Sequence, residues 1–160
     1  GGIYYYYPGS DAAPLSGSNA KNVGRTASGT VNNGEIYIGA SWKMLSLKYY
    51  HSVTDYFELP DSKGTGYLDL SANFDLGNGW GVNGHVGYTD VNNRDDLDYT
   101  DWKLGVTKDI GGYVFGLSYI DTDAAKSSYT WTKSTVNASS TGKQIYAGKA
   151  TAVLSVTKSF

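Results

Sequence analysis

The stretch that decides the fold is Gly66 to Leu76, which reads G-Y-L-D-L-S-A-N-F-D-L. Apolar residues fill every second position without a gap, and polar residues or tyrosine fill the positions between them. A period of two places these two sets on opposite faces of a β-strand. Gly77-Asn78-Gly79 then accepts the positive φ of a tight turn, and the chain returns through alternating residues from Trp80 to Thr89. The sequence predicts a hairpin with one apolar and one polar face.

The same alternation recurs along the chain and predicts about eight strands, from a first strand at Gly2 to Tyr7 to a last strand at Lys149 to Phe160. The connections between them are rich in Gly, Ser, Asn and Asp. The predicted long loops are residues 9–34, 55–65, 90–98 and 121–148, and the predicted short turns are residues 43–45, 77–79 and 109–112. Long and short connections therefore alternate.

This alternation of connection lengths is typical of outer-membrane barrels, which have short periplasmic turns and long external loops. We therefore expect an all-β fold, an antiparallel up-and-down transmembrane β-barrel that forms a single domain over residues 1–160. In such a barrel the last strand closes the cylinder against the first. We expect the strand that ends at Phe160 to be the one recognised by the barrel-assembly machinery.

Aromatic residues bracket the apolar rows and predict two interfacial girdles. The two groups are separated by about 8 residues at ~3.3 Å per residue, which in tilted strands spans roughly the 25 Å apolar band of such barrels. The candidates beside the short turns are Trp42, Trp80, Tyr113 and Phe160, and those toward the long loops are Tyr88, Trp102 and Tyr119.

The composition supports this fold class and excludes several others. The chain has 15 Tyr, 21 Gly and no Cys, which suits half-buried strands and excludes both a disulfide framework and thiol catalysis. No apolar run approaches the ~20 residues that a membrane helix needs. A net charge of −2 gives no reason to expect nucleic acid as a partner. The chain opens on Gly-Gly without Met, so we expect a processed form or a fragment.

A soluble, lipocalin-like barrel is the main alternative, with the apolar row turned inward around a ligand. The periodicity alone does not separate the two, because the polar row can face water in either case. The girdles, the loop asymmetry and the terminal Phe160 favour lipid on the outside.

Four strings carry a resemblance to a known family: E-I-Y-I-G-A-S-W, G-Y-L-D-L-S-A-N-F-D-L-G-N-G-W, D-Y-T-D-W-K-L-G-V-T-K-D-I and G-L-S-Y-I-D-T-D. With the terminal V-L-S-V-T-K-S-F, the chain resembles the TorF family of porins over nearly its whole length. The resemblance implies an outer-membrane protein of a Gram-negative bacterium, embedded in the lipid bilayer. Family members usually carry a signal peptide and several more strands before the position of Gly1, so two interpretations stay open: an eight-stranded barrel, or the C-terminal part of a larger one.

Strand number controls the function that we expect. Eight strands enclose a lumen just filled by side chains, whereas a water-filled channel needs more. In a larger barrel the chain would allow passive diffusion of small polar solutes, and its excess of carboxylates over amines would give a weak cation preference. The candidate lumen-lining residues are Glu35, Lys48, Asp69, Asn73, Asp75, Asn83, His85, Asp101 and Lys103. The alternative is a structural or adhesive barrel that presents its loops without conducting, and a homo-oligomer is open in both cases.

We do not expect an enzyme or a cofactor. His51 has Ser52 and Asp55 nearby, but in a strand Ser52 points to the opposite face from His51. His85 lies in the polar row and is best explained as a hydrogen-bonded lumen residue. The acidic residues of the 90–98 loop lack the spacing of a calcium-binding loop, and the sequence has no zinc or phosphate-binding motif.

Overall fold

The computed structural model describes residues 1–8, 32–132 and 144–159 of the chain. Eight strands build the main sheet: β1 (Gly2–Tyr5), β2 (Asn33–Trp42), β3 (Leu45–Ser52), β4 (Gly66–Gly77), β5 (Trp80–Asp90), β6 (Tyr99–Ile110), β7 (Tyr113–Thr122) and β10 (Thr151–Lys158).

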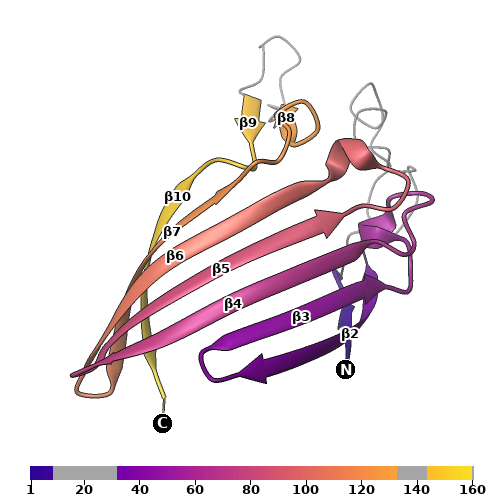
Figure 1. Cartoon of the computed structure of the whole chain (residues 1–160). Helices are drawn as coiled ribbons and strands as arrows, with labels where there is room; N and C mark the ends of the chain where they lie inside the picture. Colours follow the sequence, from indigo (N-terminus) through magenta and orange to yellow (C-terminus); the bar gives the residue numbers. More distant parts are fainter. Residues whose placement is uncertain (9–31, 133–143, 160) are drawn as a thin grey trace.

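These strands form one antiparallel sheet in the order β1-β2-β3-β4-β5-β6-β7-β10 (Figure 1). Each strand pairs with the strand that follows it in this order, from β1 with β2 to β7 with β10. The predicted all-β, antiparallel arrangement of eight strands is confirmed. No helix in the described ranges is long and apolar enough to cross a membrane.

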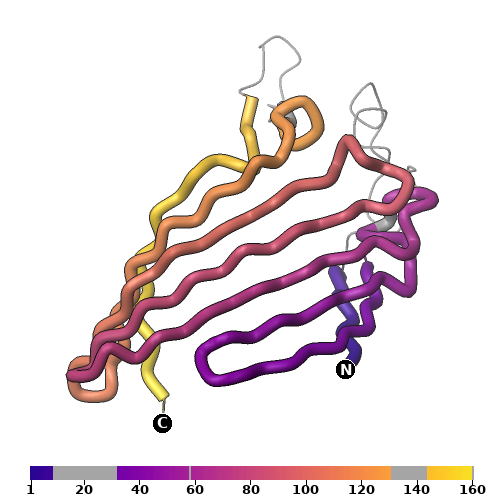
Figure 2. The backbone as a smooth tube through the Cα atoms, viewed as in Figure 1, coloured from indigo at the N-terminus to yellow at the C-terminus, as the bar shows by residue number. Residues whose placement is uncertain are grey.

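The sheet is open, which corrects the expectation that the last strand closes against the first. Among the described strands, β1 pairs with β2 alone and β10 pairs with β7 alone. The sheet curls so that β1 and β10 pass behind its central strands on opposite sides (Figures 1 and 2). The described sheet is therefore curved and open, and its shape is an arc (Figure 1).

The short turns agree with the prediction except at their boundaries. Strand pairing extends into each predicted turn, so the connections reduce to residues 43–44, 78–79 and 111–112. Asn78 and Gly79 have φ of 51° and 76°, and Gly111 and Gly112 have φ of 62° and 83°. Two consecutive residues with positive φ match the twist of the flanking strands, which is why these two-residue hairpins form where the sequence offers Asn and Gly.

The predicted long loops hold more structure than the sequence indicated. The 55–65 loop contains a 3-10 helix η1 (Tyr56–Glu58), and the 90–98 loop contains η2 (Asp95–Leu97). The 121–148 loop contains β8 (Thr130–Thr132) paired with β9 (Gln144–Tyr146). Elements of three residues are too short to show a period in the sequence, so the sequence indicated only loops in these regions.

Strands also extend into three of the predicted loops, and in the 90–98 loop the overlap is the single residue Asp90 at the end of β5. β2 starts at Asn33, inside the predicted 9–34 loop, and β7 runs to Thr122, inside the predicted 121–148 loop. Residues 9–31 and 133–143 of these loops lie outside the described residues. The extra strand residues are paired across the sheet, and this long-range pairing overrides their loop-like composition.

The hydrophobic core is small and lies at the long-loop end of the sheet. Leu59, Val91 and Leu97 pack together there, with Tyr56 and Tyr129 against them. None of these residues belongs to a strand of the main sheet. The core therefore joins loops to each other and leaves both faces of the sheet without a conventional buried core.

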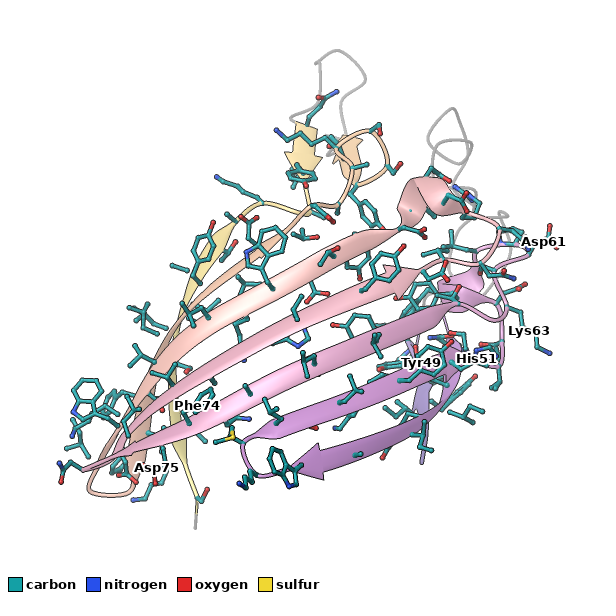
Figure 3. All side chains as sticks on the ribbon, in the orientation of Figure 1. Tyr49, His51, Asp61, Lys63, Phe74 and Asp75 are labelled. Atoms are coloured by element: carbon teal, nitrogen blue, oxygen red, sulfur yellow. The ribbon has the colours of Figure 1, made fainter. Side chains whose placement is uncertain are left out.

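The two faces of the sheet differ sharply in exposure. Apolar side chains along the strands stand outward, including Leu154 at 82% exposed and Leu104 at 64% exposed. Tyr49 and Phe74 belong to this apolar face (Figure 3). The opposite, polar face is the concave one. On this face, Tyr67 of β4 reaches across the intervening β5 to contact Asp101 of β6. We call these two surfaces the apolar face and the polar face.

Candidate functional site

The strand register places every candidate lumen-lining residue on the polar face. Lys48 lies opposite Asp69, and Asn73 lies opposite Asn83. The remaining members follow from the period of two along each strand. The full set is Glu35 on β2, Lys48 on β3, Asp69, Asn73 and Asp75 on β4, Asn83 and His85 on β5, and Asp101 and Lys103 on β6.

His85 forms the centre of this face because it lies between two carboxylates. Its Nδ1 is 3.3 Å from Asp69 Oδ2 on β4, and its Nε2 is 2.8 Å from Asp101 Oδ1 on β6. The His85 side chain is 16% exposed, so the cluster is largely shielded from solvent. A ring nitrogen that carries a proton donates it to the carboxylate that it faces. The imidazole thus links three neighbouring strands.

Two hydroxyl groups hold the carboxylates in place, and sequence reasoning missed both. Tyr67 donates a hydrogen bond to Asp101 Oδ2 at 3.1 Å, and Ser71 donates one to Asp69 Oδ1 at 2.7 Å. Both residues occupy the polar row of Gly66 to Leu76, so their place in that row was the signal that could have identified them. The cluster is a fixed hydrogen-bonded network.

The network also includes a contact between Ser71 and the imidazole. Ser71 Oγ donates to Asp69 Oδ1 and lies 3.3 Å from His85 Nδ1. Each nitrogen of His85 faces a different carboxylate, and no group of three or more acidic or imidazole side chains in the described ranges is arranged to hold a metal ion. Lys48 and Lys103 lie opposite Asp69 and His85, so charges of both signs cross the middle of the polar face.

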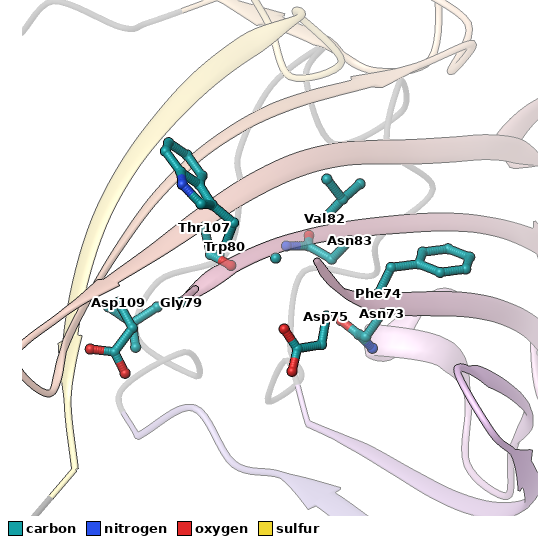
Figure 4. Close-up of a pocket in the computed structure, with 11 residues that line it drawn as sticks. Asn73, Phe74, Asp75, Gly79, Trp80, Val82, Asn83, Thr107 and Asp109 are labelled. Carbon is teal, nitrogen blue, oxygen red and sulfur yellow. The ribbon is translucent and has the colours of Figure 1, made fainter. Parts of the chain in front are cut away.

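A cavity of about 420 Å³ lies beside the short turns. Asn73, Asp75 and Asn83 contribute to its lining, together with Thr107 and Asp109. Trp80 points away from Asp75 and Asp109, toward the apolar face (Figure 4). The Oδ1 atom of Asn83 is buried without a hydrogen-bond partner among the described residues. This cavity at the short-turn end of the polar face is separate from the His85 cluster.

The candidate girdle residues by the short turns share an unexpected feature, a lysine over each ring. Lys43 Nζ is 4.5 Å from the ring centre of Trp42, Lys108 Nζ is 4.9 Å from that of Trp80, and Lys158 Nζ is 4.2 Å from that of Tyr113. These are cation–π distances. Phe160, the fourth candidate of this group, lies outside the described residues.

The candidates toward the long loops contact acidic residues instead. Tyr119 donates to Asp121 Oδ2 at 2.8 Å, and the hydroxyl of Tyr88 is 3.5 Å from Asp98 Oδ2. Both carboxylates lie nearer to the long loops than the tyrosines that contact them, so the hydroxyls are oriented toward that end. Trp102 is in the same row and has no hydrogen bond of this kind in the described structure.

The surroundings shift the pKa of three titratable groups in the long loops. Burial is the main cause of the raised pKa of Tyr56 and of Tyr129, and the neighbouring Tyr99 adds to it in both cases. Arg94 donates hydrogen bonds to both carboxylate oxygens of Asp96 and holds the pKa of that carboxyl below its usual range. The long-loop end therefore contains both a buried core and the ion pair of Arg94 with Asp96, which is accessible to solvent.

Together the fold and these contacts define an antiparallel all-β protein whose curved sheet has an exposed apolar face and a hydrogen-bonded, charged polar face. Within this class, the chain belongs to the Gcw_chp family, described as bacterial proteins of unknown function, which matches residues 1–160. No curated protein and no solved structure matches the chain. The family description assigns no activity, so the resemblance to TorF porins stays a prediction.

Proposed function

We propose that this chain forms part of the wall of an outer-membrane β-barrel in a Gram-negative bacterium and that the barrel allows passive diffusion of small polar solutes. The observation that carries the proposal is the contrast between the two faces of the sheet. Leu104 and Leu154 are largely exposed on the apolar face, while the charged His85 cluster is shielded on the polar face. A protein that folds in water buries apolar area instead, because that burial is its main source of stability. Lipid around the apolar face removes the conflict.

The open sheet supports the larger of the two barrels that the sequence allowed. A barrel of eight strands has a lumen just filled by side chains, whereas a wider one contains water. In our proposal the described sheet is an arc of the wider barrel, and further strands join the edges of β1 and β10. The polar face then lines the channel. Its carboxylates outnumber its lysines, which favours weakly the passage of cations.

The proposal includes the partners expected for such a barrel. The lipid bilayer covers the apolar face, with the aromatic residues at both of its borders. The three lysines over Trp42, Trp80 and Tyr113 suit the headgroup region beside the short turns, where an apolar ring and a charged amine can both be accommodated. The barrel-assembly machinery would recognise the strand that ends at Phe160.

A second candidate is a surface protein that presents its loops without conducting. The small core of Leu59, Val91 and Leu97 favours it, since this core gives the long-loop end a defined shape. Loops that only connected strands would not need such packing. The two candidates share the same sheet and differ in whether the polar face encloses an open channel.

Reconstitution into a planar bilayer tests the proposal. The 160-residue chain is refolded in detergent and compared with a form extended at its N-terminus by the additional strands. We expect steady current from the extended form and no current from the short one. Silence from both forms, with insertion verified by protease protection, would favour the loop-presenting protein. A chain that stays monomeric and folded without detergent would contradict the membrane assignment itself.

A further inference from the structure

A cavity of about 300 Å³ lies on the polar face at the long-loop end. It is bounded by β1 to β6 on one side and by η1 on the other. Its size is at the lower end of the range for small-molecule sites. The aromatic residues in its lining are Tyr5, Tyr50, Tyr56, Phe57, Tyr67 and Tyr99.

The loop residue that closes this cavity has a strained backbone. Phe57 has φ 47° and ψ 44°, the left-handed region that a bulky residue rarely occupies. In this conformation its ring lies 5.6 Å from the ring of Tyr5 and 4.7 Å from that of Tyr56. Local strain of this kind persists where surrounding contacts determine it, and it concentrates at ligand-binding sites. The strained conformation therefore places the ring of Phe57 in the lining of the cavity.

The aromatic wall continues across the sheet as a row of rings. Tyr37 and Tyr50 have centres 5.4 Å apart, and Tyr50 and Tyr67 have centres 6.0 Å apart. The three residues are direct neighbours on β2, β3 and β4. The negative faces of such rings attract a cation that lies within about 6 Å of the ring centre.

Besides Ile3 and the aromatic residues, the lining contains the carboxylate of Glu35 and the hydroxyl of Thr89, and each lacks a partner of its own kind of interaction among the described residues. Glu35 accepts a hydrogen bond of 2.7 Å from the Asn33 amide, but it forms no ion pair with any residue that the structure describes. Thr89 is 1% exposed, and its Oγ1 has no hydrogen-bond partner in the described structure. A buried polar group without a partner is costly, and a bound ligand can supply that partner.

We propose that this cavity binds a small organic ammonium cation. The rings of Tyr50 and Tyr67 offer their faces to the alkylated nitrogen, and Glu35 supplies the opposite charge. The hydroxyl of Thr89 pairs with a hydroxyl or N–H group of the ligand. A neutral sugar would also stack on the rings, but it would leave the charge of Glu35 without compensation.

The site needs only the folded sheet and η1, so it is independent of conduction. Transfer of the bound cation along the channel, past Asp69 and Asp101, is the one step that rests on the proposed function. Binding is therefore measured on its own, by calorimetry with the refolded chain, and current is measured separately. Binding by the refolded chain without current from the N-terminally extended form would retain the site and contradict the channel, and current from the extended form without binding would do the reverse.

Choline is the probe, since it carries both a quaternary nitrogen and a hydroxyl. We expect it to bind, whereas its uncharged isostere 3,3-dimethylbutan-1-ol and glucose bind at least about tenfold more weakly. Equal binding of choline and the isostere would overturn the proposal, because the site would then recognise shape alone. Stronger binding of glucose would identify a sugar site instead. No choline binding by a chain with a β-sheet circular dichroism spectrum would also overturn it.

Variants locate the binding on these residues. Glu35→Gln retains the side-chain shape and should weaken choline binding by about tenfold. Tyr50→Leu should weaken it by a similar factor, whereas Tyr50→Phe keeps the ring and should retain most of the affinity. Asp75→Asn removes an equal charge from the cavity at the other end of the polar face and should leave binding unchanged. Equal loss in Asp75→Asn and Glu35→Gln would reduce the effect to general electrostatics and contradict the site.

Discussion

The apolar face and the polar face of the sheet are built from the same strands, yet their surroundings are opposite. On β6, Leu104 is 64% exposed while the side chain of Asp101 is 25% exposed. Curvature explains part of this difference, because side chains converge on a concave face and spread on a convex one. Curvature does not explain why the apolar residues lie on the convex face. Our proposal accounts for it by placing lipid against the convex face.

The comparison also shows how each face is held together. On the apolar face, residues such as Leu47 and Leu70 are cross-strand neighbours and contribute through their side-chain pairs. On the polar face, His85, Asp69 and Asp101 connect three strands through hydrogen bonds. The first kind of contact tolerates many apolar residues, whereas the second depends on particular groups. Substitutions should therefore affect the two faces differently.

The largest effect is expected from a charge placed on the apolar face. Leu104→Arg lies in the middle of β6 and should cost about 2–4 kcal/mol of unfolding free energy in lipid, because the cation must leave water. Asn73→Arg places the same charge on the polar face, where we expect a loss below about 1 kcal/mol. Guanidinium unfolding in lipid vesicles measures both. Equal losses would show that lipid does not surround the apolar face.

A smaller effect is expected from the centre of the polar face. His85→Ala leaves Asp69 and Asp101 without their shared partner and should cost about 1–2 kcal/mol, a value reduced for the partial exposure of both carboxylates. His51 belongs to the opposite face by the period of two and is the matched control. His51→Ala should change the unfolding midpoint little. A larger loss of stability in His51→Ala than in His85→Ala would contradict the prediction that the polar face depends more on specific contacts.

The border of the apolar face should respond less strongly. Lys108→Met removes the cation over Trp80, together with its exposed hydrogen bond of 2.6 Å to the carbonyl oxygen of Asn78, while it retains an unbranched side chain. We expect a loss of about 0.5–1 kcal/mol, the usual size of an exposed cation–π contact. Quenching of Trp80 fluorescence by brominated lipids should also show the ring at a changed depth. An unchanged depth and midpoint would mean that Lys108 does not help to anchor the ring.

The smallest effect concerns Asp96 in the long-loop end, which belongs to neither face. The hydrogen bonds from Arg94 lower the pKa of Asp96, so this pair stabilises the folded state above the ordinary carboxyl pKa of about 3.9. The contribution is lost as the pH falls through the lowered value. Carbon-13 NMR titration should find the Asp96 pKa below the ordinary range, and Arg94→Gln should raise it. A pKa that Arg94→Gln leaves unchanged would contradict the contact.

The strands and their two faces could be predicted from local patterns in the sequence. Alternation from Gly66 to Leu76 is a local pattern, and so are the two-residue turns at Asn78-Gly79 and Gly111-Gly112. These features follow from backbone geometry within a few residues, so the alternation alone separates the residues of a strand into two rows. The predicted roles in a lumen and in a girdle concern the surroundings of the sheet and stay predictions.

Which residues contact one another across the sheet is seen only in the folded structure. The strand register brings His85 between Asp69 and Asp101, and the return of η1 over the sheet brings Phe57 onto Tyr5. The tertiary structure also decided that β1 and β10 remain apart, so that the sheet is an arc rather than a closed cylinder. Register, curvature and loop return arise from contacts between residues far apart in the chain. A period of two carries no information about them, since every register that keeps the faces intact has the same local pattern.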